Sequence, residues 1–331
     1  MELESLHILH ETGLTMLIAI DSTARGPALG GCRWRSYPDE EAARRDAADL
    51  ARAMTRKAAL ADLSLGGGKA VVIGDPGDRT RDQLLAFGSF VDSLEGRYIT
   101  AADMGTGEEE MAVIAERTLH VSGLPQRLGG PGGPGPFTAI GVHLAMQAAL
   151  AQLGLSLEGA RVAVQGVGNV GFGLIQRLLG SGASVCASDT RPKALEALPE
   201  EVELVDPAAI VTRECDVFSP CGPPGVIDAQ NMAALRCRII CGAANNPLAS
   251  PELAAELARC GILYVPDFLA NAGGLIHLAV ALEGGDEAAS QARLRVIPEN
   301  LERVMERARR SRVTPAEAAE ELAGRAALEQ A

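Results

Sequence analysis

The stretch ARVAVQGVGNVGFGLIQRLLGSGASVCASD, residues 160–189, predicts a strand, a helix and a second strand in close succession. The three elements cover residues 161–165, 170–179 and 184–188. A G-x-G-x-x-G loop joins the first strand to the helix, and the second strand ends at Asp189. The residues of this loop that we expect to bind a ligand are Gly166, Gly168, Asn169, Val170 and Gly171. A strand, a glycine loop, a helix and an acid in this order predict a dinucleotide-binding unit.

The two ends of this unit predict how a dinucleotide would bind. The pyrophosphate would lie at the helix N-terminus, where free N–H groups and the helix dipole favour an anion. Asp189 would accept hydrogen bonds from the adenosine ribose and repel a 2′-phosphate, so the sequence favours NAD over NADP. Arg191 lies close to this acid and leaves NADP open.

Further strands are expected after this unit, and they alternate with helical stretches. They cover residues 216–219, 238–241 and 262–265. Alternation of this kind completes a parallel sheet, which predicts a Rossmann domain of the α/β class. An α/β domain that binds no nucleotide is the alternative.

Eight residues made only of glycine and proline, GGPGGPGP at 129–136, precede the Rossmann domain. No helix or central strand is expected to include them, so they predict an interdomain hinge. A chain of 331 residues is long enough for two domains with a cleft between them. We therefore expect an N-terminal α/β domain of residues 1–134, joined by C-terminal helices of about 300–331, and a cofactor domain of residues 135–299. A capping box and a proline predict the last helix over residues 315–328.

The stretch LGGGKA, residues 65–70, places Lys69 directly behind three glycines and before a β-branched run. A phosphate-binding loop is excluded, because Leu63 stands where its first glycine is required and Ala70 replaces its serine or threonine. The other interpretation is that the glycines let a small substrate approach closely while Lys69 acts from the mouth of a strand.

Two neighbouring stretches supply further charged side chains. A helix is expected to begin at Asp39, and its apolar stripe carries Lys57. The stripe consists of Ala43, Ala47, Leu50, Met54 and Ala58. A strand over residues 98–101 is followed by Asp103, at the strand end where open α/β sheets place their chemistry. The plain alternatives are that Lys57 covers the helix edge with its stem and that Asp103 is a structural cap.

Composition argues against several classes of function. The net charge of −13, with no basic cluster, argues against nucleic acid as a partner. The apolar run near the N-terminus, residues 16–20, is too short for a signal peptide or a membrane span, so we expect a cytoplasmic protein with no membrane partner. Seven cysteines without a C-x-x-C pair fit reduced thiols, and five histidines without ligand spacing predict no metal site.

These stretches together resemble the amino-acid dehydrogenase family that includes leucine, phenylalanine, valine and tryptophan dehydrogenases and, more distantly, glutamate dehydrogenase. The similarity covers nearly the whole chain. It is carried by GPALGGCR (26–33), MTRKAA (54–59), LGGGKAVVIGDP (65–76), GRYITAADMG (96–105), GVGNVG (166–171), CGAANN (241–246) and YVPDFLANAGG (264–274). The resemblance implies two α/β domains, NAD as cofactor and a homo-oligomer of two or more chains. It also implies reversible oxidative deamination of an L-amino acid to its 2-oxo acid and ammonia.

The resemblance further implies roles for residues on the substrate side. Lys57, assisted by Asn271, would bind the substrate carboxylate. Lys69 would act as acid and base, with a pKa lowered by desolvation and by the neighbouring Lys57. Asp103 would move protons to and from the substrate nitrogen. An apolar pocket, which argues against glutamate as the substrate, would be lined by Leu29, Gly30, Gly31 and Ala101.

On the cofactor side, the resemblance places Thr138 at the nicotinamide amide and Asn245 near the nicotinamide ribose. Other residues implied there are Cys221, Ala243 and Asn271. Two stretches depart from the family pattern. Prolines stiffen residues 220–225, and His277 stands where asparagine is common, in a segment that is several residues short. The preferred hydrophobic amino acid, branched-chain or aromatic, is therefore left open.

Two other functions stay open from the sequence. One is an imine or 2-oxo acid reductase built on the same nucleotide domain. The other is a nucleotide-binding homologue without turnover, against which the intact Lys57, Lys69, Asp103 and Asn271 speak.

Overall fold

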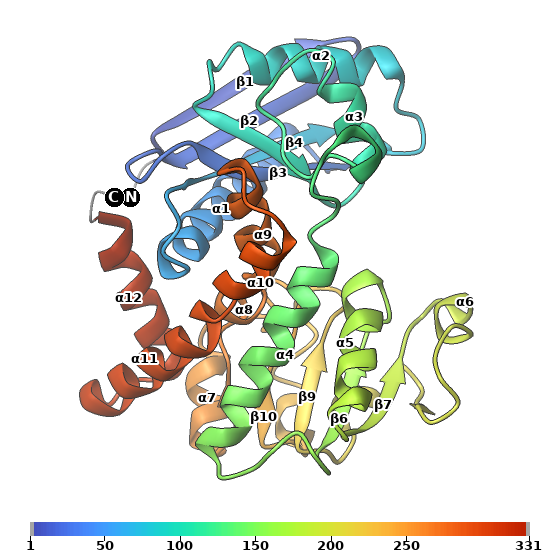
Figure 1. Cartoon of the computed structure of the whole chain (residues 1–331), viewed down its shortest axis with the longest axis vertical. Helices are drawn as coiled ribbons and strands as arrows, with labels where there is room; N and C mark the ends of the chain where they lie inside the picture. The colour runs from blue at the N-terminus through green and yellow to red at the C-terminus, as the bar shows by residue number, and fades with distance from the viewer. Residues whose placement is uncertain (1–2, 329–331) are drawn as a thin grey trace. The chain divides into compact units, whose positions relative to one another are not determined.

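The computed structural model describes residues 3–328, and its contacts divide the chain into two compact units (Figure 1). The first unit holds the described residues up to Pro134, together with Leu275–Ser290 and the described part of Ala323–Ala331. The second unit consists of Gly135–Gly274 and Gln291–Leu322. The expected mixed α/β class with two sheets is confirmed. The division into a substrate domain and a cofactor domain stays a prediction.

A mixed five-stranded sheet forms the centre of the first unit. Its strands, in the order β1-β2-β4-β3-β5, are β1 (Ser5–Glu11), β2 (Leu14–Ser22), β4 (Gly66–Ile73), β3 (Ala28–Arg35) and β5 (Tyr98–Ala102). The strand β4 runs antiparallel to β2 and parallel to β3, and β3 runs parallel to β5. One face carries α2 (Arg81–Asp92) and α3 (Glu108–Ile114), and α1 (Glu40–Leu60) lies on the other (Figure 1). The two faces of β3, β4 and β5 therefore bury different residues.

The helix α1 begins where the sequence predicts, because the Asp39 side chain accepts a hydrogen bond from Ala42 N at 2.7 Å. The predicted apolar stripe is only partly right. Leu50 and Met54 are half-buried, and the buried face runs instead through residues one position further along. The buried residues are Ala43, Ala47, Ala51, Thr55, Ala58, Ala59 and Leu60. Small side chains occupy this face because the helix packs very close to the sheet.

The three glycines of β4 explain how α1 comes so close. A Cβ on Gly67 would lie 2.1 Å from the backbone nitrogen of Thr55 and 2.6 Å from Ala51 O, both on α1. A Cβ on Gly66 or Gly68 would collide with a neighbouring strand or with the ring of Tyr98. The expectation that these glycines open a path for substrate is therefore wrong. They make room for the helix and for the aromatic core instead.

The segment around His277 closes the first unit. This histidine is buried in α9 (Gly273–Leu282), and its Nδ1 lies 2.9 Å from the hydroxyl of Ser290 in α10 (Glu287–Arg293). Its Nε2 lies 3.2 Å from Pro131 O, in the glycine- and proline-rich stretch. Burial lowers the pKa of His277. A neutral imidazole therefore links α9 to α10 and to residue 131.

The second unit is built on a six-stranded sheet whose neighbouring strands are all parallel. In the order β11-β10-β9-β6-β7-β8 they are β11 (Leu263–Tyr264), β10 (Ile239–Ile240), β9 (Val217–Pro220), β6 (Arg161–Gln165), β7 (Ser184–Ser188) and β8 (Glu203–Leu204). The chain order reverses between β6 and β9, which is the switch point where doubly wound sheets bind their ligands. The predicted parallel sheet is thus confirmed, with strands at every predicted place.

Helices cover both faces of this sheet. The thiol of Cys241 points to Val142 O of α4 (Gly135–Gln152), on the face that α5 (Asn169–Gly180) shares in Figure 1. On the opposite face, α7 (Leu253–Arg259) packs its Leu257 into a core with Phe218. The other helices of the unit include α6 (Pro192–Leu195), α8 (Asp267–Ala270) and α11 (Val296–Ser311). The helix α12 (Pro315–Leu328) belongs to this unit up to Leu322. The predicted capping box is present, since Glu317 N donates to Thr314 Oγ1 and Glu317 accepts from Thr314 N.

One expectation about the glycine- and proline-rich stretch 129–136 is wrong. Its last two residues, Gly135 and Pro136, already belong to α4. Proline is tolerated in the first turn of a helix because its nitrogen has no helical partner there. The stretch therefore ends as a helix start and not as a loop.

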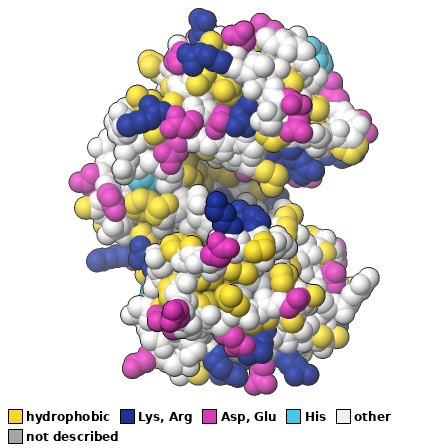
Figure 2. Space-filling view, turned by 90° about the vertical axis from the view of Figure 1, so that its right-hand side faces the viewer, with side chains coloured by type: hydrophobic (Ala, Val, Ile, Leu, Met, Phe, Trp, Pro, Cys, Tyr) yellow, Lys and Arg dark blue, Asp and Glu magenta, His cyan; other side chains and the backbone are white. Residues whose placement is uncertain are grey.

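Over the described residues, the chain has no helix that is long and apolar enough to cross a membrane. All seven cysteines lie in the described part and are free of disulfides. Over the face seen in Figure 2, Lys and Arg side chains lie among Asp and Glu side chains. Within residues 3–328, no group of three or more His, Cys, Asp or Glu side chains could hold a metal ion.

The packing of α1 on β4 predicts the effect of Gly67→Ala. The added methyl group would force the helix away from the strand, and we expect the free energy of unfolding to fall by about 1–3 kcal/mol. Urea unfolding followed by circular dichroism measures this change. Gly324→Ala in α12 is the matched control, because no atom lies within 4 Å of its added Cβ. Equal stability of Gly67→Ala and the unaltered chain would contradict the packing argument.

Candidate active site

The sequence suggested that Lys69 lies at the mouth of a strand. In the structure it lies in the middle of β4. Side chains alternate along a strand, so Lys69 shares the α1 face of the sheet with Gly67 and Val71. Its side chain is only 6% exposed. A lysine so deeply buried needs a partner for its amine.

That partner is Asp103, which follows β5 as predicted. Lys69 Nζ donates to Asp103 Oδ2, and Met104 N donates to Asp103 Oδ1 at 2.6 Å. The strand between them is β3, where Gly31 pairs with Ala101 of β5. A Cβ on Gly31 would lie 2.7 Å from the Cβ of Asp103. The missing side chain of Gly31 is therefore what lets the lysine and the aspartate meet across the intervening strand.

The other residues predicted in the substrate site of the first unit lie on both faces of the sheet and on α1. Leu29 and Ala101 share the face of Lys69, by the alternation along β3 and β5. Gly30 points to the opposite face, where its Cβ would collide with the backbone of Gly68. Its carbonyl oxygen accepts a 2.5 Å hydrogen bond from the hydroxyl of Tyr98. Lys57 is half-buried on α1, next to the buried face of that helix.

Arg33 is a charged neighbour that the sequence analysis missed. It lies on the same face of β3 as Gly31, with Nε 3.8 Å from Asp103 Oδ2 and Nη1 3.0 Å from Asp46 Oδ2. The side chain is 14% exposed. The signal was available, because GPALGGCRW places an arginine two residues after Gly31, at the spacing that shares a face of a strand with it.

The surroundings of Lys69 favour its neutral form. Burial, and after it the Arg33 guanidinium, lower the pKa of Lys69 to about 7. Lys57 acts in the same direction, as expected from the sequence, but Arg33 contributes more. Asp46 acts in the opposite direction. The Asp103 carboxylate accepts a hydrogen bond from Lys69, and a carboxylate in that position also favours the ammonium form. Lys69 can therefore take up or release a proton near neutral pH.

The scarcity of lysine in this chain also draws attention to Lys69. Of the 30 lysine and arginine residues only three are lysines, at positions 57, 69 and 193. Two of these three belong to the group around Asp103. Arginine does not lose its proton in proteins, whereas a buried lysine does so readily. The buried Lys69 is thus a cation that can titrate where an arginine could not.

The second unit carries the glycine loop that the sequence predicted, and each glycine has a separate reason. Gly166 has a φ of +94° and approaches the backbone of Cys221. A Cβ on Gly171 would lie 2.0 Å from Gly166 O, so this glycine lets α5 pack on the strand. A Cβ on Gly168 would meet only Arg191 Nη2, at 4.0 Å, and as the N-cap of α5 this glycine leaves the N–H groups of the first turn without a capping side chain. These features fit the pyrophosphate of a dinucleotide, with Asn169 and Val170 in the first turn of the helix.

Asp189 lies at the end of β7 and is bound to this loop. Its Oδ2 accepts a hydrogen bond from Val167 N at 2.8 Å. Arg191 donates through its backbone nitrogen and Nε to Oδ1, at 2.8 and 3.1 Å, and through Nη2 to Oδ2 at 3.2 Å. The Arg191 side chain holds the pKa of Asp189 at about 2. Both oxygens of the acid are therefore already in use, although the guanidinium that uses them is 66% exposed.

Asn271 lies at the end of α8, close to two other predicted residues. Its Nδ2 donates to Ala243 O at 3.1 Å and to Asn245 Oδ1 at 2.8 Å. Its Oδ1 is buried without a hydrogen-bond partner. The side chain therefore offers a hydrogen-bond acceptor to a ligand. A carboxylate needs a donor, so the predicted contact of Asn271 with a substrate carboxylate does not match this orientation.

The structure brings Cys221 to the glycine loop, since its backbone nitrogen donates to Gln165 O at 2.7 Å. Thr138 is half-buried in the first turns of α4 and lies against Gly273, whose Cβ would come 3.3 Å from the Thr138 Cα. Both residues are thus at the end of the sheet where the strands finish, as the Rossmann fold requires of a ligand site.

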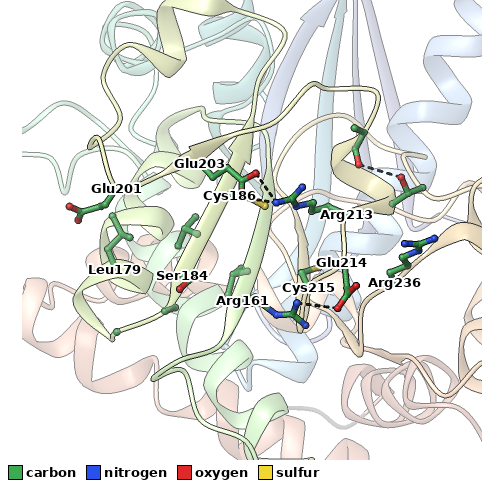
Figure 3. Close-up of a pocket in the computed structure, with 16 residues that line it drawn as sticks. Arg161, Leu179, Ser184, Cys186, Glu201, Glu203, Arg213, Glu214, Cys215 and Arg236 are labelled. Atoms are coloured by element: carbon green, nitrogen blue, oxygen red, sulfur yellow. Dashed lines mark hydrogen bonds and ion pairs between the residues drawn. The ribbon is translucent and has the colours of Figure 1, made fainter.

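A cavity of about 1030 Å³ lies at the opposite end of this sheet, where β6 and β7 begin (Figure 3). It is lined by Arg161, Arg213 and acidic residues that pair with them. Arg161 lies 3.2 Å from Glu214, and Arg213 lies 2.7 Å from Glu203. Because the glycine loop lies at the far strand ends, this cavity is not part of the predicted cofactor site.

Comparison with known proteins shows the family to which this chain belongs. Residues 6–120 match the family model described as Glu/Leu/Phe/Val dehydrogenase, dimerisation domain. Residues 129–191 and 188–330 match the model described as Glutamate/Leucine/Phenylalanine/Valine dehydrogenase. The leucine dehydrogenase of Bacillus subtilis (strain 168) is 41% identical over 318 residues, which cover 95% of this chain and 87% of that protein. The valine dehydrogenase of Streptomyces virginiae is 41% identical over 320 residues, which cover 94% of this chain and 89% of that protein.

A solved structure agrees with these matches. The crystal structure of L-tryptophan dehydrogenase from Nostoc punctiforme superposes with a TM-score of 0.83 and 36% identity, over 98% of this chain and 96% of that chain. The fold and the matches place this chain among the NAD(P)-dependent dehydrogenases. It belongs to the Glu/Leu/Phe/Val dehydrogenase family of amino-acid dehydrogenases. The resemblance found in the sequence is thereby confirmed.

The lowered pKa of Lys69 predicts how stability depends on pH. The unfolded chain holds this proton up to a pKa of about 10.4, whereas the folded chain releases it at about 7. Between these values the unfolded state binds more protons, so the stability that Lys69 contributes rises with pH. Relative to Lys69→Met, we expect the free energy of unfolding of the unaltered chain to rise by up to about 1.4 kcal/mol per pH unit in this window.

Urea unfolding of both proteins at several pH values between about 7 and 10 checks this expectation. Lys193→Met, which changes an exposed lysine, is the control, and its curve should run parallel to that of the unaltered chain. A parallel curve for Lys69→Met as well would contradict the lowered pKa of Lys69.

Proposed function

We propose that this protein catalyses the NAD-dependent, reversible oxidative deamination of a hydrophobic L-amino acid. The products are the 2-oxo acid, ammonia and the reduced cofactor, and one water molecule is consumed. The observation that carries the proposal is the buried Lys69 in contact with Asp103, in a chain that belongs to an amino-acid dehydrogenase family. The curated relatives and the tryptophan dehydrogenase structure are named as dehydrogenases of leucine, valine and tryptophan. Nothing in the comparisons supports the reductase or the silent homologue considered above.

The proposed chemistry uses the two units for different tasks. NAD, held by its pyrophosphate at the glycine loop, would supply the hydride acceptor, so that loss of a hydride from the substrate Cα leaves an imine on the substrate. Lys69, as a neutral amine, would take a proton from the water that attacks this imine. Asp103 would carry protons to and from the substrate nitrogen, and its contact with Lys69 keeps the two groups together. Lys57 remains the proposed partner of the substrate carboxylate.

The orientation of Asn271 supports a modified role for this residue. Its unpartnered Oδ1 suits a donor, such as the amino group of the substrate or the carboxamide of nicotinamide. Its Nδ2 is held by Ala243 and Asn245. We therefore propose that Asn271 accepts a hydrogen bond from one of these groups and leaves the carboxylate to Lys57.

The proposed substrate is hydrophobic because Leu29 and Ala101 share the face of Lys69. An ionised side chain placed among such residues without a partner would be costly. The names of the relatives agree with a hydrophobic substrate and include both branched-chain and aromatic amino acids. We leave the choice between these two kinds to experiment.

Two further features belong to this proposal. A homo-oligomer is supported by the match of residues 6–120 to a dimerisation domain and by β1, whose outer edge pairs with no strand in the described part of the chain. The crystal structure of the hetero-hexameric glutamate dehydrogenase of Thermus thermophilus, which is 25% identical, also matches the fold with a TM-score of 0.83. A cytoplasmic location and the absence of a metal stay predictions from the sequence.

A substrate panel tests the proposed function. With NAD at alkaline pH, we expect leucine, valine, phenylalanine or tryptophan to be oxidised with a kcat/KM at least about 100-fold above that of glutamate. Absorbance of the reduced nicotinamide measures the rate. No reaction with any amino acid, in either cofactor, would contradict the proposal.

Lys69→Met serves as the matched variant for this panel. It should lower kcat by about 100-fold or more, because a general acid and base contributes that much. Binding of the reduced cofactor, followed by its fluorescence, should be unchanged, since the glycine loop belongs to the other unit. Oxidation of the reduced cofactor by a 2-oxo acid without ammonia would instead point to a reductase.

The pairing of Asp189 with Arg191 predicts how cofactor preference can be changed. Asp189→Ser removes the charge that repels a 2′-phosphate and releases the exposed Arg191 to bind it. We expect the ratio of kcat/KM with NAD to that with NADP to fall by about tenfold or more. The double variant with Arg191→Ala should lose the gain with NADP. An unchanged ratio in Asp189→Ser would remove Asp189 from cofactor selection.

A further inference from the structure

The proposed deamination needs Lys69 as a neutral amine, yet its main neighbour opposes that state. Asp103 accepts a hydrogen bond from Lys69 Nζ, and a carboxylate with one cation beside it keeps that cation protonated. A second, permanent cation beside Asp103 would remove the conflict. Arg33 is placed to be this cation.

Given amino-acid deamination as the function, we propose that Arg33 is the permanent counter-ion of Asp103 and acts as a positioning residue for the Lys69 amine. The three side chains come from neighbouring parts of one sheet, on β3, on β4 and just after β5. They share the α1 face, with Gly31 leaving space between them. In this arrangement Arg33 acts on Lys69 through Asp103.

The guanidinium of Arg33 has one N–H donor that makes no hydrogen bond in the structure. Its Nε is buried without a hydrogen-bond partner and lies 3.8 Å from Asp103 Oδ2. A hydrogen bond forms at about 2.9 Å, so a shift of about 1 Å would bring the two atoms into contact. When Lys69 turns toward water or substrate, Asp103 loses a donor. Arg33 can then take its place and keep the carboxylate ionised.

The other end of Arg33 is anchored. Its Nη1 donates to both carboxylate oxygens of Asp46 on α1, at 3.0 and 3.3 Å. Asp46 in turn accepts a 2.5 Å hydrogen bond from the hydroxyl of Tyr37. Burial and Asp46 raise the pKa of Tyr37, so this hydroxyl keeps its proton. A forked guanidinium can hold Asp46 and face Asp103 at the same time, which a lysine ammonium cannot do equally well.

The charged and titratable groups that affect the pKa of Lys69 come from three places. They are Cys32 and Arg33 on β3, Asp46 and Lys57 on α1, and Asp103 after β5. Burial raises the pKa of Cys32 to about 12, so its thiol is neutral and the balance lies with the four charges. Arg33 and Lys57 favour the amine, and the two aspartates favour the ammonium form. Removal of Arg33 and removal of the Asp46 charge must therefore shift the pKa of Lys69 in opposite directions.

The experiment measures the titration of Lys69 itself. A chain with three lysines, grown with lysine labelled by ¹³C at Cε, gives three signals, and Lys69→Met identifies the one sought. We expect Arg33→Gln to raise the midpoint of Lys69 by about one pH unit or more, and Asp46→Asn to lower it. Arg33→Lys should raise it by less. Arg81→Gln, which removes an arginine of α2 that pairs with Glu116, is the control and should leave the midpoint unchanged.

Turnover supplies the second readout. The rising limb of kcat/KM against pH should move with the Lys69 midpoint in each variant, while the alkaline plateau of Arg33→Gln is retained. A merely structural role for Arg33 would lower the plateau and leave the midpoint in place. That result, or shifts in the same direction for Arg33→Gln and Asp46→Asn, would overturn the proposal. If Arg33→Gln does not fold, Arg33→Lys replaces it, and an unshifted Lys69 midpoint in that variant would overturn the proposal.

The two readouts separate this proposal from the proposed function. A shifted Lys69 midpoint in a protein that oxidises no amino acid supports the role of Arg33 and rejects deamination. An unshifted midpoint in an active enzyme retains deamination and rejects the role of Arg33.

Discussion

The contact between Lys69 and Asp103 constrains much of the first unit. A buried amine is tolerated only with a charged partner, and here that partner comes from beyond the neighbouring strand. Gly31 must therefore lack a side chain, and α1 must lie close enough to exclude water from the same face. Gly67 and the alanines of α1 provide that approach. The small residues of this unit thus follow from the burial of one charge.

The second unit could be read from the sequence because its evidence is local. The strand, the glycine loop, the helix and Asp189 lie within 30 residues, and each was found where the pattern put it. The three glycines differ in their reasons, yet all three reasons are contained in the βαβ unit itself. Local patterns of this kind need no knowledge of strand order.

The first unit could be predicted only in part, because its decisive contacts are not local. Lys69 and Asp103 were found from a glycine run and a strand end, and the resemblance supplied their roles, but the role proposed for Arg33 depends on the strand order β4-β3-β5 and on Asp46 from a separate helix. The glycines of β4 were misread for the same reason, since the atoms they accommodate belong to α1 and Tyr98. A pattern in one strand cannot report what packs on it.

In each unit the carboxylate to which we assign a function is paired with a cation of the same unit, and the two cations differ in exposure. Lys69 is buried beside Asp103, whereas Arg191 beside Asp189 faces the solvent. A cofactor that displaces Arg191 releases it into water at little cost. Freeing Asp103 from Lys69 would leave a buried ammonium group and a half-buried carboxylate unpaired unless another cation replaced the lysine or the lysine lost its proton. The position of Arg33 and the lowered pKa of Lys69 supply both conditions, so proton transfer can occur in the first unit without a large rearrangement of its core.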